Sequence, residues 1–369
     1  FGPTVYSGAV QASLPNSNLT WEKTKEFDFG FDAGFFKNRI NLSYDYYTRR
    51  TTSLLYGVSV AQESGYSSFM ANIGELKFWG HEIMLNTKNL VGKFSWETSF
   101  NIAFTDNKVM ALSGGIDRIY SGLFSSNITK VGGKIGMLYG MVWDGVYDNQ
   151  SEFDSSPKAI LSEVGTIKYK DVGGGANGAP DGRITNGGDN DDRTIIGDPT
   201  PKFTYGMTNT FSYKSVDLSV VLAGAYGNKI VVWNDQSLAN LDGNFNVYKE
   251  LKDRWRSPEN PGAGKYGKST SGTSNERDWI SSRFLSDGSY LAIKNVTLGY
   301  SIPTKKVFTN LRVFMSVQQL YTFTKYRGAN PESGNSFTQN GSTSALTLGS
   351  DFASFPIPRT VSFGLNIGF

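Results

Sequence analysis

Oxygen-bearing side chains are concentrated in one Gly-rich stretch, residues 171–198, and their spacing is the clearest chemical signal in the chain. Calcium loops place oxygen ligands two residues apart before a Gly turn and end on a Glu ligand. Asn177, Asp181, Gly182 and Ile184 follow part of that spacing. This pattern makes the stretch a candidate calcium loop.

The stretch departs from a calcium loop at two positions. Ala179 occupies the middle ligand position, and Gly188 stands where the closing Glu would lie. Asp189, Asp191 and Asp192 offer replacement oxygens, but a Gly/Asp-rich turn without a metal is the favoured alternative. The sequence requires no cofactor, and calcium in this loop is the single candidate. The candidate metal ligands are Asn177, Asp181, Asp189, Asp191 and Asp192.

Catalytic side chains of the usual kinds are missing from the sequence. The chain has no Cys and one His, His81. This composition excludes thiolate nucleophiles, disulfides, zinc–sulfur sites and multi-histidine metal sites, and it prevents the usual nucleophile–base pairs. A net charge of +3 over 369 residues, without a basic run interleaved with aromatics, gives no reason to expect nucleic acid. We therefore expect no enzyme, and a structural place for His81 in a strand.

Aromatic residues in the long loops are the remaining candidates for ligand contact. Such rings stack on sugars, but they equally form girdles at a membrane interface or cores inside loops. The structural alternative is favoured for each ring taken singly. The candidate ligand-binding residues are Tyr226, Trp233, Trp255 and Trp279.

The elements that must position these residues are β-strands, because hydrophobic residues recur with period two. In the last segment, Val361, Phe363, Leu365, Ile367 and Phe369 alternate with small or polar residues. No stretch approaches 18 uninterrupted apolar residues, so a transmembrane helix is excluded, whereas strands of a transmembrane barrel alternate in this way. The barrel-assembly machinery of outer membranes reads a terminal aromatic residue that closes such a strand, so Phe369 is expected to be this barrel-assembly signal.

Eight further segments upstream show the same alternation, so the sequence predicts about nine strands. These segments are 27–33, 40–46, 75–88, 94–107, 203–213, 216–222, 296–302 and 311–317. Phe314 blurs the pattern because it stands at a polar position.

Connection lengths predict the orientation of the strands. Turns near 35–38, 90–93, 213–215 and 303–310 are short, and those at about 56–73, 109–201, 228–288 and 325–356 are long. Outer-membrane barrels have short periplasmic turns and long extracellular loops, so the last strand is expected to end at the periplasm. Bacterial single-chain barrels have even numbers of strands, so partners for nine strands are expected in sequence outside this chain or in another chain.

A soluble all-β sandwich or adhesin is the alternative fold. Its strands would be shorter, about 5–6 residues, and its connections would not alternate so strictly. The favoured fold class is an all-β, antiparallel transmembrane β-barrel, of which the chain holds about nine strands with long extracellular loops. One short helix, 247–255, is expected inside a loop and ends before Pro258.

Six segments of the chain match, in order, motifs of one family. They are 18–24 (NLTWEKT), 72–75 (NIGE) with 80–82 (GHE), 196–202 (IGDPTPK), 254–261 (RWRSPENP), 291–300 (LAIKNVTLGY) and 355–360 (FPIPRT). The sequence resembles the C-terminal half of SusC/RagA-type TonB-dependent transporters, which are found in outer membranes of Bacteroidetes. Any one segment is a weak match, but six in the right order, spanning nearly the whole chain, are specific.

The resemblance implies a 22-stranded barrel filled by an N-terminal plug. Residues 1–369 are then expected to be the C-terminal part of that barrel, with the last nine strands, and the plug domain, TonB box and signal peptide to lie outside this chain. The resemblance also implies import of a nutrient too large for porins, commonly an oligosaccharide or a peptide. The expected partners are a SusD-like surface lipoprotein lid, TonB, the lipid bilayer with its lipopolysaccharide, and a second transporter complex in a homodimer.

A second class of function stays open, in which the barrel is a non-transporting structural subunit of a larger outer-membrane assembly. An intact TonB box and plug in the full-length sequence would favour import, and their loss would favour the scaffold. Both alternatives place the protein in the outer membrane of a Gram-negative, Bacteroidetes-type bacterium, with its C-terminus in the periplasm.

Overall fold

The computed structural model describes residues 14–59, 63, 65–66, 68–112, 116–175, 178–241, 246–269, 279–304, 309–332 and 345–368. Asn177 and Phe369, two of the predicted site residues, lie outside these residues. Within them, helices are short, and none has the length and apolar character needed to cross a membrane.

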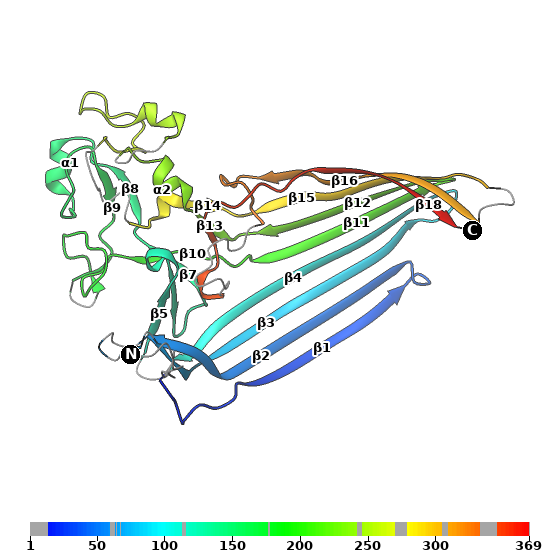
Figure 1. Cartoon of the computed structure of the whole chain (residues 1–369), viewed down its shortest axis with the longest axis horizontal. Helices are drawn as coiled ribbons and strands as arrows, with labels where there is room; N and C mark the ends of the chain where they lie inside the picture. Colours follow the sequence, from blue (N-terminus) through cyan, green and yellow to red (C-terminus); the bar gives the residue numbers. More distant parts are fainter. Residues whose placement is uncertain are drawn as a thin grey trace, which may run out of the picture.

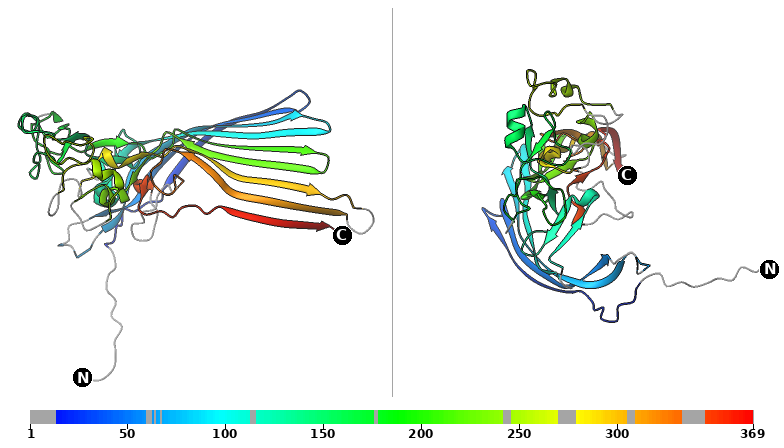
Figure 2. Two further views of the ribbon diagram at one scale, coloured as in Figure 1. Left: turned by 90° about the horizontal axis from the view of Figure 1, so that it is seen from above. Right: turned by 90° about the vertical axis from the view of Figure 1, so that its left-hand side faces the viewer.

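A nine-stranded antiparallel sheet dominates the described part of the chain, as the sequence pattern predicted. Figure 1 shows its long strands side by side, and Figure 2 shows that the sheet curves into an open arc. This arrangement confirms the predicted barrel wall. In spatial order, the strands are β1 (Lys23–Phe35), β2 (Ile40–Ser59), β3 (Ser68–Leu90), β4 (Phe94–Leu112), β11 (Phe203–Tyr213), β12 (Val216–Tyr226), β15 (Tyr290–Ser301), β16 (Asn310–Thr324) and β18 (Thr360–Gly368).

The register of the strands separates an apolar face from a polar one. Directly paired residues of antiparallel strands point to the same side of a sheet. Phe31 pairs with Tyr44, which pairs with Ile83, whereas the neighbouring row joins Asp45 with Glu82. The apolar rows continue across the sheet to Phe363, Leu365 and Ile367 of β18, all of them exposed. The two faces therefore match a wall with lipid on one side and water on the other.

Phe314 lies on the polar face, and the structure explains why. A Cβ on Gly364 would come within 2.2 Å of the Phe314 ring, so the ring covers the surface left bare by that glycine. An aromatic ring over a cross-strand glycine fills space that would otherwise weaken the strand pair. Tyr47 covers Gly80 in the same manner.

Short turns lie at one end of the sheet, and the long connections gather at the other (Figures 1 and 2). The turn between β1 and β2 places Phe36, Lys37 and Asn38 at φ angles of 52°, 56° and 60°. Lys214 closes the turn between β11 and β12 at a φ of 54°. Residues in the left-handed region permit tight reversals of the chain, so the connections at this end of the wall are short.

The long connections fold into a loop domain with small sheets and short helices. One sheet has the order β10 (Thr194–Gly197), β7 (Met137–Gly140), β6 (Asn127–Lys130) and β5 (Arg118–Ser121). The other elements are β8 (Trp143–Val146), β9 (Ile167–Tyr169), β13 (Lys229–Val232), β14 (Leu285–Asp287), β17 (Ser350–Asp351), α1 (Gln150–Ser155), α2 (Asn234–Leu238) and 3₁₀ turns at Leu123–Ser125, Lys249–Asp253, Ser282–Phe284 and Ala345–Thr347.

Two predictions from the sequence were wrong, one about a strand connection and one about a helix. The connection expected at 56–73 is shorter, because β2 continues to Ser59 and β3 starts at Ser68. Bulges around Ser53, whose φ is 57°, shift the pairing and interrupt the period-two pattern that sequence reading relies on. The helix expected at 247–255 is a five-residue 3₁₀ turn, Lys249–Asp253.

Candidate functional site

The loop domain is held together by a buried apolar cluster and by buried polar side chains. Leu138, Val231 and Phe284 are almost fully buried in one cluster. Asn127 is also fully buried, and its Nδ2 donates to the carbonyls of Gly136 at 2.9 Å and Leu348 at 3.0 Å. The contact to Leu348 joins segments that are 221 residues apart in sequence, so it holds the sheet of β10, β7, β6 and β5 against a distant part of the chain.

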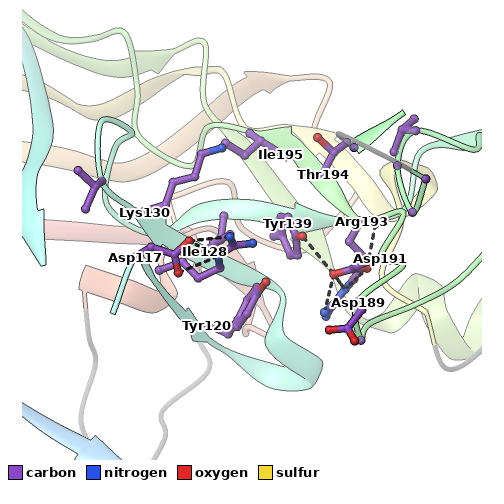
Figure 3. A pocket seen from close by; sticks show the side chains of 18 residues that line it. Asp117, Tyr120, Ile128, Lys130, Tyr139, Asp189, Asp191, Arg193, Thr194 and Ile195 are labelled. Atoms are coloured by element: carbon purple, nitrogen blue, oxygen red, sulfur yellow. Dashed lines mark hydrogen bonds and ion pairs between the residues drawn. The ribbon is translucent and has the colours of Figure 1, made fainter. Parts of the chain in front are cut away.

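A pocket of about 640 Å³ lies between that sheet and the Gly/Asp-rich stretch. Tyr120 of β5 and Tyr139 of β7 form one side, and Figure 3 shows Asp191 and Arg193 facing Tyr139. Backbone of Gly173–Gly175 forms part of the opposite side. The lining thus combines aromatic rings with both signs of charge, a surface suited to a polar ligand.

Arg193 contributes a mostly buried positive charge to the pocket and contacts both tyrosine rings and Asp191. Its guanidinium carbon lies 5.4 Å from the Tyr120 ring centroid and 5.2 Å from that of Tyr139. Its Nε donates to both carboxylate oxygens of Asp191 at 3.0 Å, and the two side chains are only 15% and 14% exposed. A guanidinium held over ring faces and by a carboxylate has one orientation.

The environment shifts the pKa values of the pocket residues. Burial and the nearby Asp191 carboxylate raise the pKa of the Tyr139 hydroxyl. Burial alone would raise the pKa of Asp191, but hydrogen bonds from Arg193 and from the backbone of Gly187 outweigh it and lower that pKa. Asp191 is therefore a carboxylate, and Tyr139 a neutral donor to it at 3.2 Å, at neutral pH.

Asp192 accepts hydrogen bonds from backbone amides of the Gly-rich stretch. It is fully buried and accepts hydrogen bonds from the amides of Val172, Gly173 and Thr185 at 2.9, 3.1 and 2.8 Å. Burial raises its pKa, which those amide donors counteract. This carboxylate ties the start of the stretch to its end and so shapes the glycine side of the pocket.

The predicted calcium ligands do not converge within the described residues. There, no group of three or more His, Asp or Glu side chains is arranged to hold a metal ion. Asp191 and Asp192 use their oxygens for Arg193 and backbone amides, Asp181 accepts from the Arg183 amide, and Asp189 is exposed on the pocket rim. Because Asn177 lies outside the described residues, the calcium site stays a prediction, and the turn alternative accounts for the contacts seen.

The predicted ligand-binding aromatics occupy different places. Trp233 is 3% exposed and donates from Nε1 to Ser350 Oγ at 2.5 Å, and Trp255 is 8% exposed with its ring against Gly165. Both are core residues of the loop domain, so their faces are packed by protein. Trp279 is half-buried, with its ring 5.6 Å from that of Tyr169.

Tyr226 is exposed, but it lies on the apolar face of the wall. It pairs with Phe203, and the two ring centroids are 5.2 Å apart in a stacked arrangement. This position corresponds to the membrane-girdle alternative rather than to a ligand contact inside the barrel. His81 lies on the same face, where its Nδ1 is 2.9 Å from the Tyr44 hydroxyl, and this is the structural place expected for it.

Sequence reading missed Tyr120, Tyr139 and Arg193. No local motif marks them, because they are brought together only by the pairing of β5, β6, β7 and β10. The one available signal was the position of Arg193 directly after Asp191 and Asp192, where a cation can neutralise neighbouring carboxylates.

A second hollow, about 670 Å³ in volume, lies mainly on the polar face of the wall. Asp45 and Glu82 are adjacent in the register there, and further polar groups come from Ser43, Asn101, Thr204 and Tyr290. The inner face therefore offers hydrogen-bonding groups along the strands and not only in the loops.

Comparisons with known proteins agree with this architecture. No family model matches the chain. TonB-dependent receptor P3 of Formosa agariphila is 34% identical over 381 residues, which is 100% of this chain and 36% of that protein. TonB-dependent receptor SusC of Bacteroides thetaiotaomicron is 30% identical over 371 residues, covering 94% of this chain and 33% of SusC.

A solved structure supports the same fold. The RagAB peptide transporter superposes with a TM-score of 0.78 at 22% identity, over 96% of this chain and 36% of the transporter chain. The chain thus spans about a third of the length of the curated relatives it matches. These relatives are described as receptors and transporters rather than enzymes. Over nearly its whole length the chain is thus similar in sequence to TonB-dependent receptors, SusC among them, and in fold to the RagAB transporter.

Proposed function

We propose that the chain forms the C-terminal part of the barrel of a TonB-dependent importer in the outer membrane of a Bacteroidetes-type bacterium. The observation that carries this proposal is similarity to TonB-dependent receptors over the full length of the chain, joined to a curved wall with one apolar and one polar face. Residues 1–369 then supply the last nine of 22 strands, and the plug, TonB box and signal peptide belong to sequence outside them.

The orientation follows from the two ends of the wall. Outer-membrane barrels have short turns at the periplasm and long loops outside. The turns after Phe35, Leu90 and Tyr213 therefore face the periplasm, as does the end of β18, and the loop domain faces the medium. In this orientation the pocket around Arg193 lies at the extracellular mouth.

The cargo is proposed to be an oligosaccharide or a peptide. Tyr120, which is 39% exposed, offers a ring for stacking, and the N–H groups of Arg193 and the exposed carboxylate of Asp189 line the same pocket. A sugar hydroxyl or a peptide amide could bond to such groups. The structural relative named as a peptide transporter gives weight to the peptide.

The partners complete the proposed cycle. A SusD-like lipoprotein would close the mouth over the loop domain, TonB would act through the part of the protein outside this chain, and two such complexes would associate as a dimer. SusC and the RagAB transporter, as relatives in sequence and fold, support this proposal.

The test is uptake by cells that make the full-length protein containing this chain. Cells with the gene intact, deleted, or intact in a tonB deletion are given fluorescent peptide pools and labelled oligosaccharides in parallel. Import predicts uptake of one class that is lost in both deletions. Equal uptake in all three strains would reject import and favour the structural-subunit alternative.

A further inference from the structure

Four basic residues stand in one row across the first four strands of the wall. Lys25 pairs with Arg50, Arg50 with Lys77, and Lys77 with Lys108. Like charges directly opposite one another in a sheet are destabilising. A row of four is therefore costly unless an anion lies against it.

The row is on the apolar face, not on the face that lines the lumen. The adjacent row of the same face joins Phe27 with Thr48 and Thr48 with Trp79. The Lys77 ammonium lies 5.6 Å from the Trp79 ring centroid, which places both side chains on one side. The cations thus border the surface that faces lipid.

The face is hollowed at this row. A groove of about 360 Å³ is lined by the basic residues Lys25, Arg50 and Lys77, by the exposed apolar residues Phe27 and Met110, and by Glu26 and Thr48, so three cations face one carboxylate there. The row of cations with the exposed Phe27 next to it, toward the short turns, matches a ligand with an anionic head and a hydrocarbon body.

Internal carboxylates leave most of this charge unbalanced. Glu75 holds Arg50 at 2.5 Å, but the Arg50 side chain remains 58% exposed. Asp106, on the same face, pairs with Lys134 at 2.8 Å. Lys25, Lys77 and Lys108 take part in neither ion pair, and they make no other ion pair within the described residues. At least three cations are therefore available to a ligand.

The height of the row on the wall matches a lipid headgroup. Lys25 stands ten residues from Phe35, where the short turn begins. At ~3.3 Å per residue this is ~33 Å along the strand, or ~25 Å of height at a tilt of ~40°. The apolar band of outer-membrane barrels is also ~25 Å tall, so the row lies at its upper edge.

We propose that this groove binds the phosphorylated headgroup of an outer-leaflet lipid. Lys25, Arg50 and Lys77 hold the phosphate oxygens as point charges and hydrogen-bond donors. Phe27, which lies next to Lys25 on the side of the short turns, contacts the first methylenes of the acyl chains. The proposal rests on the orientation given under the proposed function, because only the loop end of the wall reaches the outer leaflet.

The test uses the full-length protein, purified in detergent and stripped of lipid. Native mass spectrometry measures binding of diphosphorylated lipid A, of dephosphorylated lipid A, and of diphosphorylated lipid A with millimolar inorganic phosphate. The triple variant K25Q/R50Q/K77Q is expected to bind the diphosphorylated lipid about 10- to 100-fold more weakly, since two or more charge-assisted hydrogen bonds are lost. Wild type is expected to prefer it over the dephosphorylated lipid by a similar factor.

Two matched variants control for folding and for net charge. K25R/R50K/K77R preserves the charges and is expected to retain binding. K88Q/K93Q/K214Q removes three charges near the short turns and is expected to bind as wild type does. Unchanged binding in K25Q/R50Q/K77Q, or equal binding of the dephosphorylated lipid, would overturn the proposal, and full displacement by inorganic phosphate would mean a free-anion site instead.

Nutrient uptake separates this proposal from the proposed function. K25Q/R50Q/K77Q lies on the outer face, away from the mouth and the lumen, so its uptake is expected to match wild type. A loss of lipid binding without a loss of uptake supports the lipid site alone. Normal lipid binding by a protein that imports nothing would reject the proposed function and leave the lipid site in place.

Discussion

At the scale of single residues, the contact that shapes the candidate site is the pair of Arg193 and Asp191. Both side chains are mostly buried and hydrogen-bonded to each other, with two tyrosine rings against the guanidinium. Removing one partner leaves a buried charge without compensation, which is strongly destabilising.

We predict that D191N loosens the loop domain. The change should cost about 1.5–3 kcal/mol, the usual range for a hydrogen bond to a charged group. Hydrogen exchange of peptides spanning 117–140 and 187–197 in the folded full-length protein would show faster exchange. The matched control is D117N, whose ion pair with Arg118 is exposed to solvent and should contribute little to stability. Equal protection of these peptides from exchange in D191N and wild type would show that the Asp191–Arg193 pair does not hold the loop domain together.

The same pair predicts a pH dependence. The pKa of Asp191 in the folded protein lies below its ordinary value of 3.8, so its stabilising contribution is complete above pH 3.8. That contribution is lost as the pH falls through the lowered pKa. The neighbouring Asp192 has a raised pKa and acts in the opposite direction, because the folded state takes up its proton first.

Comparison with D191N isolates the Asp191 contribution. Hydrogen exchange of the peptide 187–197, corrected for intrinsic rates, should rise in wild type below pH 3.8, while D191N should show the faster exchange already at neutral pH. A wild-type profile that parallels D191N at every pH would contradict the assignment.

Single residues were the scale at which sequence reading was least successful. Residue type suggested that Trp233 and Trp255 might meet a ligand, but both are buried, and nothing in residue type distinguishes a stacking ring from a packed one. Asp192 looked like a metal ligand because carboxylates serve cations and backbone amides equally well. Which partner it takes depends on loop packing that no local pattern encodes.

At the scale of elements, the nine wall strands follow directly from the alternation of apolar and polar residues. Water on one side and lipid on the other impose a period of two wherever the wall is regular. The pattern fails at bulges, such as the one around Ser53, and at Phe314, whose partner Gly364 is 50 residues away. The loop domain lacks this two-sided constraint, so its strands of two to four residues were not predicted.

The assignment of faces predicts opposite effects for two neighbouring residues of β15. Leu298 is on the apolar face and 52% exposed, and Thr297 is on the polar face beside Ser316. Arg at Leu298 should cost about 2–4 kcal/mol, the depth-dependent penalty of a charge in hydrocarbon. T297R should cost much less, because its side chain enters the aqueous lumen. Urea titration of the heat-modifiable folded form in lipid vesicles measures both.

A smaller effect for L298R than for T297R would mean that the two faces are reversed. The groove proposed for a lipid headgroup would then lie inside the barrel, and the polar hollow around Asp45 outside it. The two variants thus test one relation on which several conclusions depend.

At the scale of the whole molecule, the chain is a curved wall with a domain at one end. β1 and β18 form the two edges of the nine-stranded sheet. The relatives in sequence and fold are about three times as long as the aligned part, and an importer needs a closed barrel because unpaired strand edges are costly in lipid. This relation is why transport is proposed for the full-length protein and not for the wall alone.

If the wall spans an outer membrane with its loop domain outside, single cysteines at its two ends should differ in their accessibility on intact cells. The chain contains no Cys, so I160C in the 95% exposed loop position and K93C in the turn after β3 are unique labels within it. A membrane-impermeant maleimide should label I160C on intact cells and K93C only after the outer membrane is opened. Labelling of K93C on intact cells, with I160C protected, would contradict the account.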